Sequence, residues 1–230
     1  MSTESLETYL ARTYFLDTDH PAIQAWVEQT TSTAQTDVEK AIALFNATRD
    51  DIFYNPYHVD FTPQFFKASN TLERGRSFCV AKAILYATGL RVVGIPSRLG
   101  FADVRNHLSS QRLLDLMKSD VFTYHGYTEL YLNGKWRKAT PTFNTSLCHK
   151  INIPVLDFDG ENDALFHAYT NDGQRHMEYI HYHEPSDDFH ITSLLNAWKK
   201  HYPHFFGNNT YSQIHGNFEK ELLEDRRLNS

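Results

Sequence analysis

Cysteine is scarce in this sequence: the 230 residues contain only Cys79 and Cys148. Two cysteines are too few for a disulfide framework, and a reducing compartment would keep both as free thiols. No run of apolar residues reaches the roughly 18 to 20 that a membrane span requires. Residues 1–14 also lack the basic start and apolar run of a signal peptide. We therefore expect a cytoplasmic protein without membrane contact, in which a thiol is available for chemistry.

Basic residues are outnumbered by acidic ones. The chain has 22 Lys and Arg against 28 Asp and Glu, a net charge of −6, whereas nucleic-acid binding needs clustered basic residues. We therefore expect no nucleic-acid partner. The hydrophobic fraction of 41% is ordinary for a globular protein of this length. We expect a single domain over residues 1–230, with a core at about 35–145 and a C-terminal extension at 146–230 packed on it. The sequence does not indicate an oligomeric state.

Apolar residues at helical spacing predict several helices. The predicted ranges are 21–30, 37–49, 77–87, 111–118 and 191–201, with a surface helix or frayed tail from Glu219. The helix from about Ser77 is apolar enough to be buried, and Gly89 is expected to mark its exit. Residues 91–98 are expected to form a short or edge strand because they contain Pro96. Residues 51–70 form an aromatic-rich connection that could line a site.

The clearest local signal is a β-hairpin. Residues 122–132 and 135–142 flank Asn133-Gly134, a pair that readily adopts the two positive φ values of a type I′ turn. A two-residue loop at these positions pairs the strands so that the numbers of facing residues sum to 267. The register of the whole hairpin is therefore predicted by its turn.

This register brings a histidine beside two hydroxyls. His125 faces Thr142, and Thr140 lies diagonally across on the same face, about 7 to 8 Å away. A base on a rigid strand with a hydroxyl nearby is the arrangement that a nucleophile, base and orienting group require. Glu129 faces Lys138 in the same register and is expected to pair with it.

Cys79 lies where the buried helix should begin. With Ser77 as N-cap, the unpaired backbone N–H groups and the positive end of the helix dipole would lower the pKa of the thiol. Arg76 adds a positive neighbour. The alternative interpretation is that Cys79 is a small buried apolar residue, the commoner fate of a free cysteine. Cys148 has no such context and is interpreted as a packing residue.

Taken together, these segments resemble a transglutaminase-like domain of the papain-like cysteine-enzyme superfamily. The segments that carry the resemblance are Gly75–Ala83, Gly94–Arg98, His125–Glu129 and Asn133–Thr142. The resemblance covers roughly residues 35–145 and implies an α+β fold, with the nucleophile at the N-terminus of a buried helix packed on an antiparallel β-sheet. It also implies that Cys79 is the nucleophile and His125 the base.

The sequence departs from the family pattern at Thr140, where an aspartate normally precedes Pro-Thr as the third catalytic residue. A threonine hydroxyl can fix the tautomer of His125, but it cannot stabilise the imidazolium by charge. Cysteine needs less help than serine because it is intrinsically nucleophilic, so the variant can remain active. The chain resembles an uncharacterised bacterial branch of the family with threonine at this position.

The resulting hypothesis is acyl transfer or amide hydrolysis through a thioester on Cys79, with a protein, peptide or small amide as substrate and no cofactor or metal. The Cys79 backbone N–H is the natural first oxyanion donor. Residues that could supply a second are Asn70, Gln64, Tyr54 and Tyr57. Two alternatives stay open: a weakened or inactive binding module, suggested by Thr140, and a metal-binding protein. The metal alternative would use the late histidines, His176, His181, His183 and His190.

Overall fold

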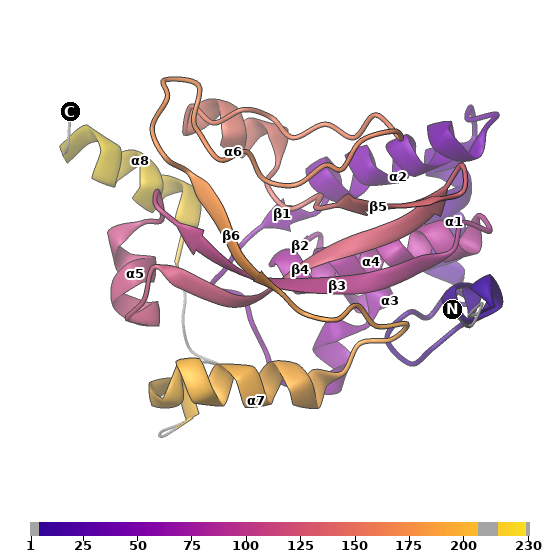
Figure 1. Ribbon diagram of the computed structural model, residues 1–230, viewed down its shortest axis with the longest axis horizontal. Coiled ribbons are helices and arrows are strands. Elements are labelled where there is room, and N and C mark those ends of the chain that lie inside the picture. The colour runs from indigo at the N-terminus through magenta and orange to yellow at the C-terminus, as the bar shows by residue number, and fades with distance from the viewer. Residues whose placement is uncertain (1–4, 207–215, 229–230) are drawn as a thin grey trace.

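The computed structural model describes residues 5–206 and 216–228. They form an α+β fold around a four-stranded antiparallel sheet in the order β5-β4-β3-β6 (Figure 1). The strands of this sheet are β3 (Ser97–Asn106), β4 (Val121–Leu132), β5 (Lys135–Ala139) and β6 (Met177–Tyr182). A separate parallel pair joins β1 (Phe53–Tyr54) to β2 (Arg76–Ser77). The α+β class and the antiparallel sheet agree with the sequence prediction.

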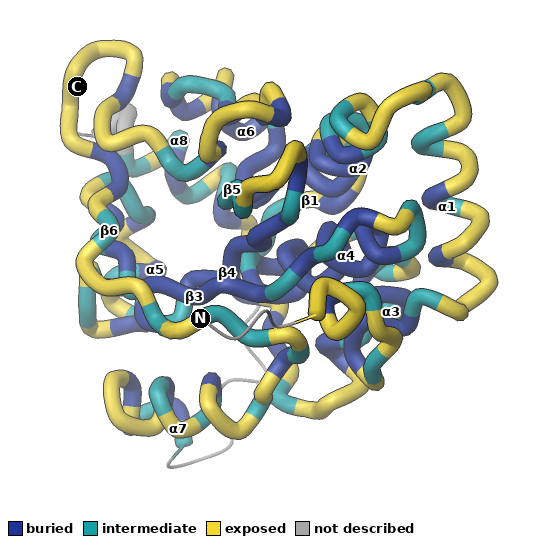
Figure 2. The backbone as a smooth tube through the Cα atoms, turned by 45° about the vertical axis from the view of Figure 1, so that its right-hand side comes forward, coloured by how far each residue is buried: buried dark blue, intermediate teal, exposed yellow. Residues whose placement is uncertain are grey.

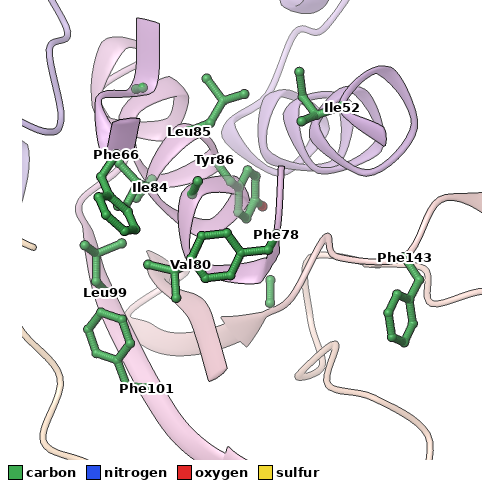
Figure 3. Close-up of a cluster of buried hydrophobic side chains, with 14 of the residues drawn as sticks. Ile52, Phe66, Phe78, Val80, Ile84, Leu85, Tyr86, Leu99, Phe101 and Phe143 are labelled. Atoms are coloured by element: carbon green, nitrogen blue, oxygen red, sulfur yellow. The ribbon is translucent and has the colours of Figure 1, made fainter. Parts of the chain in front are cut away.

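Helix α4 (Cys79–Val92) is the buried centre of the fold (Figure 2). Every residue from 80 to 91 is buried, and Val80, Ile84 and Leu85 lie among the aromatic side chains of the core (Figure 3). The predicted exit at Gly89 is wrong, because the helix continues through it. A Cβ at Gly89 would lie 2.9 Å from the Trp26 ring. This glycine therefore allows close packing within the helix and does not end it.

The N-terminal helices form as the sequence predicts. Helix α1 (Pro21–Thr31) has Pro21 in its first turn, and α2 (Asp37–Asp51) begins with a capping box between Thr36 and Glu39. In a capping box each residue satisfies a backbone N–H of the other. The remaining helices are α3 (Ala68–Arg74), α5 (Gln111–Met117), α6 (Thr145–Lys150), α7 (Ile191–His201) and α8 (Phe218–Leu228), with 3₁₀ turns η1 (Leu6–Leu10), η2 (Pro63–Phe66) and η3 (Pro203–Phe206).

The strand predicted at residues 91–98 is wrong in both position and type. Helix α4 extends to Val92, and β3 begins only at Ser97, just after Pro96. β3 then runs for ten residues between β4 and β6, so it is an interior strand. Pro96 lies just before the first residue of β3, so its missing N–H removes no hydrogen bond from the ladder.

The predicted hairpin is confirmed in its turn and register. Asn133 and Gly134 have φ values of 50° and 79°, and Leu132 faces Lys135. The ladder extends to the pairing of Thr128 with Ala139, where β5 ends. The chain beyond Ala139 therefore leaves the strand before it could pair directly with His125.

Among the described residues after 146, β6 adds an edge strand to this sheet, α7 packs on β4, and α8 packs on α5. β6 pairs with β3, and α7 lies along one side of the molecule below the sheet in Figure 1. Trp198 of α7 donates from Nε1 to the carbonyl of Thr123 in β4, at 3.1 Å. Within the described residues, none of the helices is both long and apolar enough to cross a membrane.

Candidate active site

Cys79 is the first residue of α4, as expected, but its cap differs from the prediction. Phe78 is the N-cap and provides no side-chain hydrogen bond, while Ser77 is buried in β2. The N–H groups at the start of a helix have no partner within the helix. Without a capping side chain, those near Cys79 stay available to a ligand or to the thiol. Arg76, predicted as a positive neighbour, is exposed.

A glycine brings the start of α4 against β4. At Gly126, the residue after His125, an added Cβ would lie 2.7 Å from the Cα of Val80, a distance too short for any larger residue. The backbone N–H groups of Gly126 and Val80 both act on the Cys79 thiol as hydrogen-bond donors. The thiol therefore lies beside the strand position that follows His125. The His-Gly pair has a packing reason that sequence periodicity alone does not show.

His125 is held on β4 by a chain of hydroxyl groups. Its Nε2 lies 3.2 Å from Oγ1 of Thr140, and Thr140 Oγ1 lies 3.0 Å from Oγ1 of Thr142. All three side chains are buried. The predicted grouping thus forms, although β5 ends at Ala139 and the threonines are not paired in the ladder. Because Nε2 is engaged, Nδ1 remains as the nitrogen that can exchange a proton with a thiol.

The surroundings of His125 are apolar. Its ring centroid lies 4.9 Å from that of Phe166, and Phe166 in turn stacks on Phe143 at 4.7 Å. Burial disfavours the charged form of an imidazole, and it lowers the pKa of His125 from 6.5 to about 3. A carboxylate at position 140 would oppose this effect, but the threonine hydroxyl carries no charge. His125 is therefore neutral at physiological pH.

The thiol of Cys79 is also uncharged at neutral pH. Burial raises its pKa to about 11, and the donors at Gly126 and Val80 only partly oppose this rise. The expected lowering by the helix start is therefore outweighed by desolvation, since the surrounding side chains keep water from stabilising a thiolate. The resting pair consists of a thiol and a neutral imidazole. Burial therefore favours these neutral forms over a thiolate–imidazolium pair.

Cys79 and His125 line the same pocket, which has a volume of about 60 Å³. Its wall comes from α4, α5, α7, the strands β3, β4 and β6, and the segments around Tyr54, Phe143 and Phe166. Residues 51–70 therefore contribute to the site as predicted, through Tyr54 and Pro56. Cys148 is buried outside this wall, in agreement with its interpretation as a packing residue.

The backbone just before His125 is irregular and is supported by distant residues. Tyr124 has a φ of 65°, and the register of β3 and β4 shifts at this point. The hydroxyl of Tyr202 accepts the N–H of Thr123 at 2.7 Å and donates to the carbonyl of Val121 at 2.7 Å. The predictions missed this support, because bonds between residues about 80 positions apart leave no local pattern.

Among the four residues considered as second oxyanion donors, only Tyr54 lines the pocket. Asn70 donates to the carbonyl of Gln64 and is not part of the pocket wall. The Tyr57 hydroxyl is bound to Ser110 and Glu221, and Tyr57 does not line the pocket. Tyr54 therefore remains the candidate.

Two predicted groupings of charged or metal-binding side chains are different in the structure. Glu129 faces Lys138 as predicted, but its ion pair is with Arg98, at 2.7 Å. Arg98 directly faces Glu129 from the neighbouring strand β3, and the ion pair joins a partly buried arginine to a buried glutamate. Of the late histidines, His183 bonds to Asp103 at 3.0 Å. The described residues contain no group of three or more histidine, cysteine or acidic side chains placed to hold a metal ion.

We compared the chain with known proteins and solved structures. No curated protein matches the chain. Among solved structures, it is similar to a candidate cysteine protease from Cytophaga hutchinsonii, with 16% identity and a TM-score of 0.45 over 80% of this chain and 57% of that one. It is also similar to a candidate protease from Parabacteroides distasonis, with 14% identity and a TM-score of 0.38 over 60% of this chain and 26% of that one. The chain thus spans less than two thirds of either.

The model of the transglutaminase-like superfamily matches residues 24–141, about half of the chain, and this segment includes Cys79, His125 and Thr140. The match supports a cysteine-dependent enzyme at the level of the family. The chain belongs to the transglutaminase-like superfamily.

Proposed function

We propose that this protein is a cysteine-dependent acyltransferase or amide hydrolase that forms a thioester on Cys79. The observation that carries the proposal is the shared pocket of Cys79 and His125, with the thiol bound by the N–H of the residue next to the histidine. The substrate is an amide of a protein, a peptide or a small molecule. The net charge of −6 gives no support for a nucleic-acid substrate.

The reaction follows from these positions. The sulfur of Cys79 attacks the carbonyl carbon, a C–S bond forms, and the thiol proton passes to Nδ1 of His125. The backbone N–H of Cys79 stabilises the negative charge on the carbonyl oxygen, and Tyr54 is the proposed second donor. His125 then gives its proton to the leaving amine as the C–N bond breaks. Attack by water or by another amine releases the acyl group and regenerates the thiol.

The neutral resting state determines the order of proton transfer. The pKa of the thiol is about 11 and that of the imidazole about 3, so proton transfer between them is unfavourable before substrate binds. The proton must therefore move as the C–S bond forms, when the developing charge lies on the substrate oxygen. Thr140 is a positioning residue in this scheme: it holds Nε2 so that the lone pair of Nδ1 is free.

Hydrolysis of p-nitrophenyl esters and p-nitroanilides tests the proposal. Cys79→Ser should abolish turnover, and His125→Gln should lower kcat by about 10² to 10⁴, the usual contribution of a general acid–base. Thr140→Val should lower kcat with little change in KM. Thr140→Asp should raise kcat, because a carboxylate stabilises the imidazolium form of His125. Activity that persists in Cys79→Ser, at a rate equal to that of the wild type, would refute the assignment of the nucleophile.

A second candidate function is a binding module that keeps the fold without efficient chemistry. The uncharged Cys79–His125 pair and the hydroxyl at Thr140 favour it, because both weaken the nucleophile. The two functions differ in one measurable respect. A binding module would bind substrate-like amides equally well in the wild type and in Cys79→Ser, but neither would release product or acquire an acyl group.

A further inference from the structure

The pocket that contains Cys79 lacks charged side chains. Its wall is built mainly from aromatic and aliphatic residues such as Phe78, Met117, Phe122 and Trp198. Among the described residues that line it there is no lysine, arginine, aspartate or glutamate. The polar groups in the wall are neutral amides and hydroxyls besides the thiol and the imidazole. A pocket of this composition favours an uncharged occupant.

Trp198 in α7 and Tyr202, which follows α7, direct their polar atoms away from the pocket. Trp198 uses its Nε1 to bind the Thr123 carbonyl, and Tyr202 uses its hydroxyl to bind two backbone groups of β4. Both bonds are directed at the strand, so the ring carbons form the pocket wall. The part of the wall formed by Trp198 and Tyr202 thus presents an apolar surface although both side chains carry a polar atom.

The two titratable groups of the pocket show how poorly it accommodates charge. Burial lowers the pKa of His125 to about 3 and raises the pKa of Cys79 to about 11, so each is shifted toward its neutral form. A charged substituent of a substrate would meet the same walls. Transfer of an unpaired charge from water to such surroundings is strongly unfavourable.

Resting on the proposed function, we propose that this pocket binds the uncharged, apolar side chain of the acyl residue that is transferred to Cys79. The cavity of about 60 Å³ has room for about four to six water molecules, since one needs about 10 to 15 Å³. That space corresponds to a branched aliphatic side chain. The enzyme therefore discriminates against acyl groups with a charged side chain at this position.

Alkylation of Cys79 with a matched set of iodo reagents tests the proposal without a known substrate. In each case the sulfur forms a C–S bond, iodide leaves, and the thiol proton passes to solvent. The reagents are iodoacetate, iodoacetamide and N-isobutyl iodoacetamide, which are anionic, neutral and neutral with a branched apolar group. Rates at Cys79 are measured by peptide mass spectrometry in a Cys148→Ala background and divided by the rates with N-acetylcysteine.

The N-isobutyl reagent should react at Cys79 at least about tenfold faster than iodoacetate after this normalisation, a factor that corresponds to about 1.4 kcal/mol. Equal normalised rates would overturn the pocket proposal and leave Cys79 as a nucleophile. If Cys79 reacts with none of the reagents in the folded protein but reacts in urea, the proposed function fails as well.

Asn106→Asp provides a variant of nearly unchanged size. Asn106 lines the pocket and its Oδ1 accepts the N–H of Leu108 at 3.0 Å, a bond that a carboxylate would keep. The new negative charge should raise the rate of a cationic aminoethyl iodoacetamide relative to the N-isobutyl reagent by about tenfold. An unchanged ratio would show that the bound group lies outside this pocket and would contradict the proposal.

Discussion

Replacement of His125 by glutamine should remove a defined part of the acid sensitivity of the protein. In the folded protein the pKa of His125 is about 3 because its ring is buried, whereas in the unfolded chain it returns to its ordinary value of 6.5. The pKa is depressed by folding, so below about pH 6.5 the unfolded chain binds more protons than the folded one. The free energy of unfolding therefore falls as the pH drops from about 6.5 toward 3.

The magnitude follows from the two pKa values. Each pH unit below 6.5 costs about 1.4 kcal/mol, so at pH 5 His125 should reduce the free energy of unfolding by about 2 kcal/mol. At pH 7.5 its effect is close to zero. Glutamine does not titrate, and its amide can still bond to the Thr140 hydroxyl. The variant should therefore lack this loss while it keeps the other titrating groups of the chain.

Urea unfolding of both proteins at pH 7.5, 6 and 5 measures the effect. The difference in unfolding free energy between wild type and His125→Gln should shift by about 2 kcal/mol in favour of the variant between pH 7.5 and 5. Parallel curves for wild type and His125→Gln would refute a buried neutral imidazole. A shift of opposite sign would indicate a histidine paired with a thiolate.

Three further outcomes follow from the site. The alkylation rate of Cys79 should rise about tenfold per pH unit from pH 6 to 9, because the pKa of the thiol is about 11. A timed-quench assay measures this rate, and a plateau below pH 8 would contradict the raised pKa. Gly126→Ala should lower the urea midpoint and slow turnover, since its Cβ would lie 2.7 Å from Val80 Cα; wild-type stability and turnover would show that α4 does not depend on this contact. Tyr202→Phe should lower the free energy of unfolding, measured in urea, by about 2 to 4 kcal/mol, because two buried backbone groups of β4 lose their hydrogen-bond partner. A loss below about 0.5 kcal/mol would show that Tyr202 does not support this part of β4.

The sequence was sufficient for the parts of the site that rest on local rules. The Asn133-Gly134 turn determined the register of the hairpin, and helical periodicity placed the start of the buried helix close to Cys79. Family resemblance then assigned His125 and the hydroxyl at position 140, which the structure brings within 3.2 Å. These features depend on neighbouring residues or on a motif, and both are visible in a sequence.

The features that the sequence did not reveal depend on contacts between distant segments. The sequence predicts a helix end at Gly89, because the packing of this glycine against Trp26 has no local signature. The strand predicted at residues 91–98 overlaps only the start of β3, because the residues of β3 are buried on both faces and do not alternate regularly. Glu129 was assigned to the facing Lys138, but the Arg98 guanidinium comes from the other neighbouring strand. Tertiary contacts therefore outweighed local propensity at each of these positions.

Trapping of an acyl group on Cys79 tests the central claim most directly. A p-nitrophenyl ester of a branched aliphatic acid is mixed with the enzyme, the reaction is quenched in acid, and the mass of the protein is measured over time. The account predicts one acyl group per chain on the peptide that contains Cys79, formed at least about 10² times faster in wild type than in His125→Gln. Equal rates in the two proteins, or an acyl group on any other residue, would contradict it.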